Sequence, residues 1–541
     1  MQQELRRGRP IRILLLIGFL VLALISLKFA FAHWSQSTNG QTRARRTSSG
    51  SEIILKRGGD LQSAINSAEP GDTIVLEAGA TYTGTILLPE KKGNAYITIR
   101  SSELSRLPEG QRVSPAQASL MPKIVSPGKG SPALQTARAA HHYRLIGLEI
   151  MPADEKSFAY TLIWLGLGDK QQTTLDSVPH HLTIDRCYIH AWPNQSLKRG
   201  IDLNSAETEI TNSYISDFKS TDQDAQTIVG WNGPGPFKII NNYLEASGEN
   251  LMFGGSDPQI PNLIPSDIEI RRNHFRKPLS WRGVWMCKNI LELKLGRRVT
   301  IEGNVFENSW ASGQEGYAIM FTVRNQEGTA PWSVVEDVLF ANNIVRHAAS
   351  GVMILGSDNL FPSAQSSRIT IRNNLFEDID TKWNPSATAR FLVIFNINNL
   401  TVSHNTVIGP TTIAYINPVV NKSIAITDNI IAHYNGGIIG EGIGAPDSYR
   451  QYAVPHTITG NLFVGALQQF WNADTKYPAG NRYPNSYDDV GFMNYNGGQG
   501  GDYRLKPGSP YKGKASDGKD PGADMSAIEA AVTGVVAGGQ P

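Results

Sequence analysis

The segments IINNYLEAS (residues 239–247), IRRNHFRK (270–277) and IEGNVFENS (301–309) are copies of one sequence unit. In each copy an alternating segment ends at an asparagine and is followed by bulky side chains. Five later copies have the same form: FANNIVRHA (340–348), IRNNLFEDI (371–379), VSHNTVIG (402–409), ITDNIIAH (426–433) and ITGNLFVG (458–465). Successive asparagines are separated by 31, 31, 39, 31, 31, 24 and 32 residues. Two earlier copies, IDRCYIHA (184–191) and ITNSYISD (210–217), carry Cys187 and Ser213 at the asparagine position.

This repeat predicts a stack of small β units. Each unit holds two or three strands that are too short to bury their own apolar faces, so neighbouring units must stack. Strands of one kind then lie in register about 4.8 Å apart. The recurring asparagine is expected at a bend, where it tolerates an unusual backbone and bonds to the asparagines above and below. Leucine-rich repeats need a shorter period, and propeller blades need roughly 40 or more residues. The sequence therefore predicts an all-β solenoid, a parallel β-helix.

The two ends of the repeat region have their own signals. The segment DLQSAINSAE (60–69) predicts an amphipathic helix with Asp60 as its N-cap, and such a helix can cover the open end of a stacked sheet. The capping segment (58–76), the repeats and the terminal DYRLKPGSP (502–510) resemble the pectate-lyase-like right-handed parallel β-helix superfamily. The resemblance implies a right-handed β-helix over residues 52–465 with an N-terminal capping helix. It also implies a closing segment and tail over residues 466–541, with DYRLKPGSP as the closing turn.

The N-terminal residues carry an export signal. Four arginines within residues 6–12 precede an apolar run at 13–27, and Ala-Phe-Ala follows at 30–32. This layout predicts a signal peptide or an uncleaved signal anchor over residues 1–34, and both place the rest of the chain outside the cytoplasm. Residues 35–51 are polar and predict a flexible linker, so contact with a membrane is expected only through the N-terminal segment.

The resemblance implies enzymes that remove the proton alpha to a uronate carboxylate, with Lys or Arg as the base. In NILELKL (289–295) the alternation directs the leucines to the core and Glu292 and Lys294 outward. In IMFTVRN (319–325), on the next rung, it directs Arg324 outward. Lys294 and Arg324 are therefore expected to be vertical neighbours, and a second cation lowers the pKa of a lysine. We predict Lys294 as the base and Arg324 as the carboxylate neutraliser or the acid.

Carboxylates near this pair predict a metal site. Many members of the superfamily recruit Ca²⁺ with Asp and Glu side chains, and hard cations prefer oxygen ligands. Glu249, Asp257 and Glu292 are the predicted Ca²⁺ ligands, and Asp222 and Asp224 are further candidates. The alternative for each residue is that it solvates an exposed turn. The Glu-x-Lys followed by Arg is similar to lyases acting on alginate or dermatan-type chains, but their fuller calcium signature is absent.

A basic segment follows the same rungs. Residues 271–298 contain nine lysines and arginines, in a chain whose net charge is only +2. This local excess predicts a track for a polyanion, and exposed indoles can stack on sugar rings. The predicted substrate-binding residues are Lys277, Trp281, Lys288, Trp310 and Gln326. The alternatives are a solvated positive face and tryptophans that pin long loops to the helix.

These patterns predict an exported carbohydrate-active protein, a lyase that cleaves a uronate-containing polysaccharide by β-elimination. Two alternatives stay open: a uronate C5-epimerase, and a non-catalytic glycan-binding or surface β-helix protein. An enzyme should gather its charged residues into one cleft, whereas an adhesin should spread them over many rungs. The near-neutral net charge predicts no nucleic-acid partner, and two cysteines make no disulfide scaffold. We expect an acidic polysaccharide as the partner and a monomeric chain.

Overall fold

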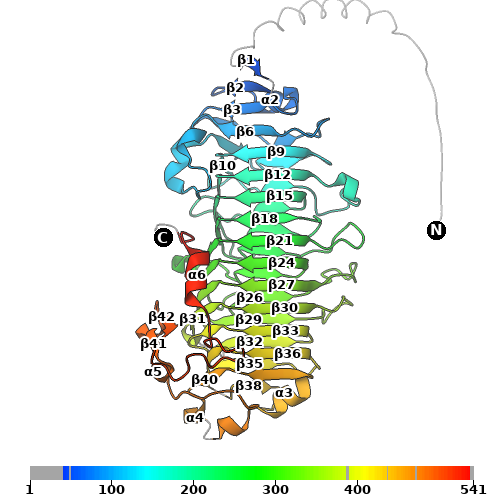
Figure 1. The fold of residues 1–541 in the computed structure, drawn as a ribbon. Helices are drawn as coiled ribbons and strands as arrows, with labels where there is room; N and C mark the ends of the chain where they lie inside the picture. Colours follow the sequence, from blue (N-terminus) through cyan, green and yellow to red (C-terminus); the bar gives the residue numbers. More distant parts are fainter. Residues whose placement is uncertain (1–40, 48–49, 385–388, 435, 470–471, 537–541) are drawn as a thin grey trace, which may run out of the picture.

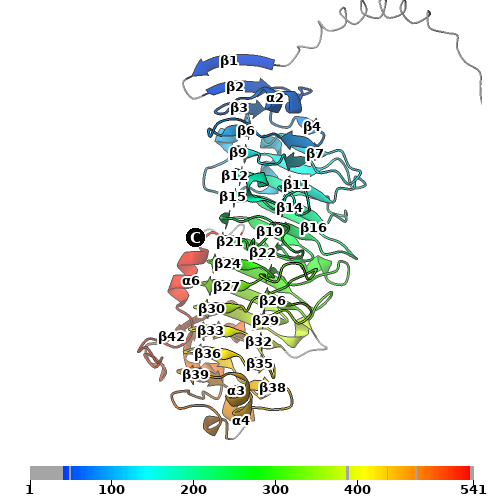
Figure 2. The ribbon, with the colours of Figure 1, turned by 90° about the vertical axis from the view of Figure 1, so that its right-hand side faces the viewer.

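The computed structural model describes residues 41–47, 50–384, 389–434, 436–469 and 472–536. These residues form a right-handed parallel β-helix with three long sheets that run the length of the molecule (Figures 1 and 2). From β3 onward each coil adds one strand to each sheet, so neighbouring strands within a sheet are three strands apart in sequence. The all-β solenoid predicted from the repeat is confirmed.

Sheet A lies on one long side of the molecule and holds the alternating segments that precede the repeated asparagines. Its strands are, in spatial order, β1 (Gln41–Thr47), β2 (Gly50–Leu55), β3 (Thr73–Leu76), β6 (Ile97–Ser101), β9 (His141–Ile146), β12 (His180–Asp185), β15 (Ala206–Thr211), β18 (Phe237–Ile240), β21 (Ser266–Arg271), β24 (Gly296–Glu302), β27 (Val335–Ala341), β30 (Ser367–Arg372), β33 (Asn398–Ser403), β36 (Lys422–Thr427) and β39 (His456–Thr459).

Sheet B holds the segments that follow the asparagines. Its strands are β4 (Thr81–Thr83), β7 (Lys123–Ser126), β10 (Glu149–Pro152), β13 (Tyr188–His190), β16 (Tyr214–Phe218), β19 (Tyr243–Ala246), β22 (His274–Arg276), β25 (Val305–Ser309), β28 (Ile344–Ala348), β31 (Leu375–Ile379), β34 (Thr406–Val407), β37 (Ile430–Ala432) and β40 (Leu462–Val464).

Sheet C completes each coil and carries the predicted catalytic segment. Its strands are β5 (Ile86–Leu88), β8 (Leu134–Thr136), β11 (Thr161–Leu165), β14 (Arg199–Leu203), β17 (Gln226–Gly230), β20 (Leu251–Phe253), β23 (Leu291–Leu293), β26 (Tyr317–Thr322), β29 (Ser350–Leu355), β32 (Arg390–Phe395), β35 (Thr412–Ile416) and β38 (Ile438–Gly440).

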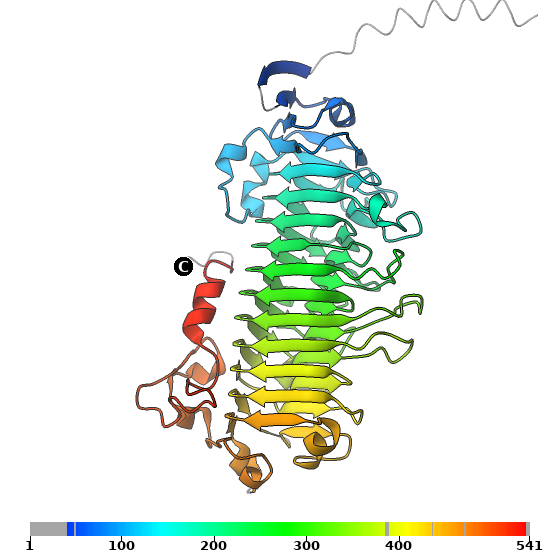
Figure 3. The same ribbon diagram turned by 45° about the vertical axis from the view of Figure 1, so that its right-hand side comes forward.

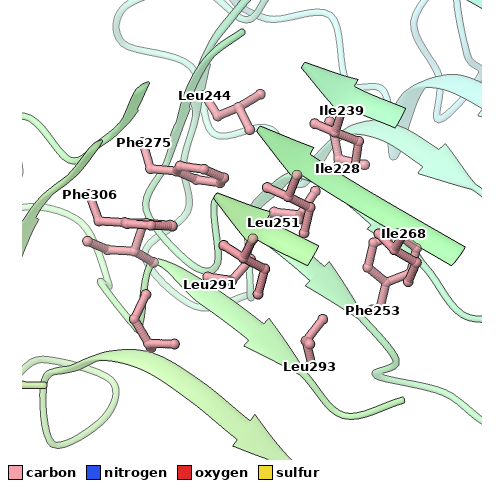
Figure 4. Close-up of a cluster of buried hydrophobic side chains, with 14 of the residues drawn as sticks. Ile228, Ile239, Leu244, Leu251, Phe253, Ile268, Phe275, Leu291, Leu293 and Phe306 are labelled. Atoms are coloured by element: carbon pink, nitrogen blue, oxygen red, sulfur yellow. The ribbon is translucent and has the colours of Figure 1, made fainter. Parts of the chain in front are cut away.

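The interior is a column of apolar side chains stacked in register. Leu251 of β20 pairs with Leu291 of β23, and both point into the core (Figure 4). Phe275 and Phe306 stack on successive rungs of sheet B, with ring centroids 4.5 Å apart and an angle of 18° between the rings. Because each rung covers the apolar face of the next, burial of about 1.5–3 kcal/mol per large side chain holds the coils together.

The asparagine ladder predicted from the repeat is present at the turn between sheets A and B. Asn273 donates from its side chain to Oδ1 of Asn304 at 3.1 Å, and its backbone N–H donates to the same oxygen at 2.9 Å. Asn304 makes the same two bonds to Asn343. All eight asparagines are fully buried: Asn242, Asn273, Asn304, Asn343, Asn374, Asn405, Asn429 and Asn461. The rungs from Asn242 to Asn461 are thus tied to one another by hydrogen bonds shielded from water.

The unusual backbone at this bend belongs to the residue before the ladder asparagine. Asn241, Asn342 and Asn373 have φ values of 57°, 56° and 53° and precede Asn242, Asn343 and Asn374. The ladder asparagine itself is therefore free to point its amide along the stack. Cys187 takes the asparagine position in an early rung, and its N–H donates to the Ser213 hydroxyl at 3.0 Å. Both Cys187 and Cys287 are buried free thiols.

The N-terminal end contains the expected helix and one unexpected strand. Helix α2 (Leu61–Ser67) is capped by the Asp60 side chain, which accepts from the Ser63 N–H at 3.0 Å, and it lies beside the first coils (Figure 1). Strand β1 pairs antiparallel with β2, within the range 35–51 that was expected to be a flexible linker. The edge of β2 offers unpaired backbone groups, and β1 satisfies them. The predicted signal segment, residues 1–34, lies outside the described residues. No helix within the described ranges is long and apolar enough to cross a membrane.

The C-terminal segment folds back along the outside of sheet B. Helices α3 (Asp447–Tyr452) and α4 (Ala466–Gln469) lie at the end of the stack (Figure 1). Helix α5 (Tyr487–Val490), strands β41 (Phe492–Asn494) and β42 (Asp502–Leu505) and helix α6 (Met525–Val532) then return alongside it (Figure 3). DYRLKPGSP forms β42 and the turn after it, so it does not close the helix as expected. The outer face of sheet B is apolar here, and this segment covers it.

Candidate functional site on the outer face of sheet C

A cluster of charged side chains lies on the outer face of sheet C, across the rungs of β17, β20 and β23. Glu292 is the central residue of β23 and aligns with Met252 of β20. Glu249 lies two residues before β20, and Lys294 directly follows β23. Alternation along β23 turns Glu292 and Lys294 away from the leucine core, whereas Glu249 lies in the bend before β20.

Glu249 is the most deeply buried acid of the cluster, with no exposed surface. Its Oε2 accepts from the Gln226 amide at 2.8 Å. Lys288 places Nζ 2.6 Å from Oδ1 of Asp224 and 3.9 Å from Oε1 of Glu249. Three polar side chains from two neighbouring rungs and the connecting loop thus surround one buried carboxylate.

Glu292 is also buried, and its contacts come from its own rung and the next one. Its Oε1 accepts from the Thr322 hydroxyl at 2.9 Å, and Nζ of Lys294 lies 3.9 Å from the same oxygen. The Lys294 side chain keeps 17% of its surface exposed. Glu292 therefore holds Lys294 at the surface of the sheet, where a ligand can reach the amine.

The electrostatics of the cluster follow from burial and from the nearness of the two glutamates. Burial raises the pKa of Glu249, and the charges of Glu292 and Asp224 raise it further against the opposing effect of the lysines. Burial disfavours the charged form of Lys288, yet Glu249 and Asp224 outweigh it and raise its pKa. The site combines two carboxylates that repel each other with a lysine held protonated between them.

Several oxygens of the cluster fit a hard cation. Oε1 of Glu249, Oε2 of Glu292 and the side-chain oxygen of Asn289 are buried and accept no hydrogen bond from the described part of the chain. Asn289 aligns with Glu249, because Leu291 pairs with Leu251 two residues later in each strand. Ca²⁺ prefers such carboxylate and amide oxygens, and a buried oxygen without a partner costs about 1–3 kcal/mol.

Asp257, the third predicted metal ligand, lies elsewhere. Its Oδ2 accepts from the N–H groups of Glu327 and Thr329 at 3.1 and 2.8 Å, and from the Thr329 hydroxyl at 2.8 Å. It therefore fastens the loop after β20 to the loop after β26. Among the described residues, Glu249, Asp257 and Glu292 do not converge as a three-carboxylate group. Asp222 is exposed and accepts from the Ser220 hydroxyl.

Arg324 lies on the rung after Lys294, but its side chain turns away. Its backbone N–H donates to the Lys294 carbonyl at 3.0 Å, so the two residues are adjacent in the stack as expected. The guanidinium instead pairs with Asp358 at 3.0 Å and also bonds to Asn359. The carboxylate pulls the arginine toward the following rung.

Lys277 is a structural residue, which corrects its predicted place in the substrate track. Its side chain is fully buried, and Nζ donates to the carbonyls of Ala246 and Ser247 at 2.8 and 3.1 Å and to Oδ1 of Asn250 at 3.0 Å. Burial lowers its pKa to about 8. The ammonium satisfies carbonyls at the turn between sheets B and C.

The two predicted sugar-stacking tryptophans are buried as well. Trp281 and Trp310 are 6% and 1% exposed and pack with Cys287 and Trp383. Lys219, also fully buried, lies over the Trp281 ring at 5.2 Å. The indoles therefore pin the long loops to the β-helix, as the alternative interpretation proposed. Gln326 is exposed in the loop after β26.

The sequence interpretation missed the polar residues that extend the cluster toward the N-terminus. The Arg199 guanidinium reaches Gln226 at 3.3 Å and lies between the rings of Tyr160 and Trp231, at 5.6 and 5.3 Å. Arg199, Gln226 and Glu249 occupy equivalent positions just before or at the start of successive sheet C strands. Only the strand register could have revealed this column, because no motif joins these residues.

A cavity of about 1020 Å³ lies elsewhere, between the β-helix and the C-terminal segment. Several of its charged wall residues already have partners: Asp520 pairs with Lys512, and Asp524 caps helix α6. The sheet C cluster, with its unpartnered oxygens, is the stronger candidate for chemistry.

The fold and this site define the chain as a parallel β-helix protein with a charged, partly buried cluster on one face. No family model and no curated protein matches the sequence. Among solved structures it is similar to an alginate lyase from Paenibacillus sp., with 15% identity over 80% of this chain and 97% of that chain and a TM-score of 0.28. It is also similar to a PL6 family polysaccharide lyase from Pseudopedobacter saltans (11% identity, 80% and 91% covered, TM-score 0.40) and to PfbA, a surface adhesin of Streptococcus pneumoniae (13%, 74% and 88%, 0.42). At these values the similarities assign no activity to this chain.

Replacing Glu249 with glutamine is expected to stabilise the metal-free protein at neutral pH. The pKa of Glu249 in the folded state is raised above its unfolded value of about 4.3. The contribution of this carboxyl to folding stability is therefore favourable at acid pH and is lost as the pH rises through the folded-state pKa. The gain in free energy of unfolding should therefore appear above about pH 4 and grow as the pH rises through the folded-state pKa, by about 1.4 kcal/mol per unit of pKa shift. Urea denaturation of both proteins in the presence of EDTA, at several pH values, measures this difference in free energy of unfolding.

The matched control is Glu209→Gln, which changes a half-exposed glutamate paired with Lys238 on sheet A. This variant should show no such gain. A Glu249→Gln protein that is less stable than the parent at every pH would contradict the charge repulsion described here.

Proposed function

We propose that this protein binds an acidic polysaccharide along the outer face of sheet C and cleaves it by β-elimination. The observation that carries the proposal is the grouping of Glu249, Glu292, Lys288 and Lys294 within adjacent rungs of one sheet face. Such grouping supports an enzyme over an adhesin, whose polar residues would be spread along the stack. An extended sheet face also suits an extended polymer.

In this proposal Lys294 takes the proton alpha to the uronate carboxylate, which requires its neutral amine. The electron pair of that C–H bond forms the new C=C bond, the glycosidic C–O bond breaks, and the leaving oxygen takes a proton from water. Lys288, held protonated by Glu249 and Asp224, is placed to attract the uronate carboxylate. Arg324 and Gln326 follow β26, on the next rung, and are the proposed further contacts.

We propose Ca²⁺ as the cofactor, held by Glu249, Glu292 and the side-chain oxygen of Asn289. Each of these three residues has a buried side-chain oxygen that accepts no hydrogen bond from the described part of the chain, which supports this donor set. When bound, Ca²⁺ would supply positive charge that neutralises the substrate carboxylate. It would also relieve the repulsion between the two glutamates.

A non-catalytic glycan-binding protein is the second candidate, and one observation favours it. Cation–π contacts continue along the same face, with Arg199 between Tyr160 and Trp231 and Arg390 over Tyr415 at 5.2 Å. These residues span many rungs, as in a binding surface. A uronate C5-epimerase would use the same proton abstraction without breaking the chain. In each case the proposed location is extracytoplasmic, and this part of the proposal rests on the N-terminal sequence.

The test is the ultraviolet absorbance of unsaturated products when the protein meets a panel of uronate polysaccharides, with Ca²⁺ and with EDTA. A rise in absorbance with one substrate, greater with Ca²⁺, is the expected result. Deuterium uptake from heavy water at the sugar carbon without absorbance would identify an epimerase. If the polysaccharide retards the protein in a gel but neither absorbance nor deuterium uptake changes, the protein is a non-catalytic glycan-binding protein.

A further inference from the structure

Four histidines lie at the start of two adjacent sheet A strands, away from the sheet C cluster. His141 and His142 open β9, and His180 and His181 open β12, with His141 paired to His180 in the strand register. The rings stack in two columns. Their centroids are 4.9 Å apart for His141 and His180 and 4.4 Å apart for His142 and His181.

The nitrogens of these rings converge. Nδ1 of His141 lies 2.8 Å from Nδ1 of His142, and the same atoms of His180 and His181 are 2.7 Å apart. One ligand atom from each of His142, His180 and His181 lies within 4.8 Å of the others. Within the described ranges no other three histidine, cysteine or acidic residues come together in this way.

A carboxylate on the next rung orients one of the rings. Oε2 of Glu207, in β15, is 2.6 Å from Nε2 of His181. If His181 donates its Nε2–H to Glu207, its Nδ1 carries the lone pair that faces Nδ1 of His180 and accepts that 2.7 Å hydrogen bond. A carboxylate behind an imidazole in this way fixes the tautomer and makes the ring a better metal ligand.

The backbone presents these side chains at a strained position. His142, His181 and Glu207 have φ values of 59°, 54° and 46°, a region that such residues rarely adopt. The same position further along sheet A holds the ion pairs Arg298–Asp267 and Arg368–Asp337. At this position other rungs of sheet A pair opposite charges. The β9 and β12 rungs instead stack the imidazoles of His142 and His181, which would repel each other if both were protonated.

We propose that His142, His180 and His181 form a binding site for a divalent transition metal of the zinc class, with His141 and Glu207 as positioning residues. Imidazole nitrogens select such ions over Ca²⁺, which prefers oxygen. Two nitrogens that share a tetrahedral zinc at about 2.0–2.1 Å lie about 3.4 Å apart. The Nδ1 atoms of His180 and His181, now 2.7 Å apart, therefore need to separate by about 0.7 Å to share the ion. The bound ion ties the β9 rung to the β12 rung and stabilises this part of the stack.

Calorimetric titration of the EDTA-treated full chain with ZnCl₂ tests the site. We expect one saturable zinc per chain and a rise in the melting temperature. CaCl₂ is expected not to compete. Co²⁺ in place of zinc should give the visible absorption bands of a tetrahedral site with nitrogen ligands. The His142→Gln/His180→Gln double variant should lose both the zinc isotherm and the cobalt spectrum.

Two further variants keep the test independent of folding defects. Glu207→Gln changes a partly exposed residue and should weaken zinc binding about 10- to 100-fold while leaving the unfolding curve of the metal-free protein unchanged. His347→Gln removes a histidine paired with Asp378 on sheet B and should leave zinc binding unchanged. Zinc binding that is absent, or equal in the folded double variant and the parent, would overturn the proposal.

Discussion

The Lys294→Ala protein is expected to lose polysaccharide cleavage by about 10²- to 10⁴-fold, the usual contribution of a general base. The lysine amine is the proposed proton acceptor, and no other lysine contacts Glu292 within the ion-pair distance among the described residues. Its loss should lower kcat more than it raises KM, because Lys288 would still attract the substrate carboxylate. The measurement is the initial rate of ultraviolet absorbance at several substrate concentrations.

The matched control is Lys238→Ala, which removes a lysine that pairs with Glu209 on the outer face of sheet A. Its rate should equal that of the parent. Circular dichroism should show both variants folded, since the Lys294 side chain is partly exposed and lies outside the core. Full activity in the folded Lys294→Ala protein would show that Lys294 is not the base. Lys288 would then be the next candidate.

The largest loss of stability is expected from Asn304→Ala, in the centre of the asparagine ladder. The Asn304 side chain accepts two bonds from Asn273 and donates to the Ile270 carbonyl and to Asn343. Alanine would leave several buried polar groups unpaired at about 1–3 kcal/mol each. We expect the free energy of unfolding to fall by about 3–5 kcal/mol, as measured by urea denaturation.

Asn94→Ala serves as the control, because Asn94 is exposed in the loop before β6. This change should alter stability by less than about 0.5 kcal/mol. If Asn304→Ala cost no more than Asn94→Ala, stacked apolar side chains would hold the coils together without help from the ladder.

Much of the fold could be predicted because the repeat has a direct physical meaning. The spacing of Asn273, Asn304 and Asn343 specifies coils that stack, and alternation in 289–295 correctly turned Glu292 and Lys294 outward. The C-terminal segment could not be placed in this way, because it packs against apolar residues on the outer face of sheet B that are distant in sequence.

The candidate site was predictable only in part. Local alternation placed Glu292 and Lys294, but it could not show that Lys277, Trp281 and Trp310 are buried, since these residues lie in or beside loops whose path depends on tertiary packing. Asp257 was misplaced for the same reason: it joins two loops through Glu327 and Thr329, about 70 residues further along the chain.

The sequence by itself determined the parallel β-helix, the buried asparagine ladder and the face on which Glu292 and Lys294 lie. These features depend on interactions that repeat with the chain's own period. The tertiary structure alone decided which residues of different rungs meet, bringing Glu249 beside Glu292 and His142 beside His181. Residues on adjacent rungs are separated by loops of variable length, so their alignment is fixed only when the strands pair.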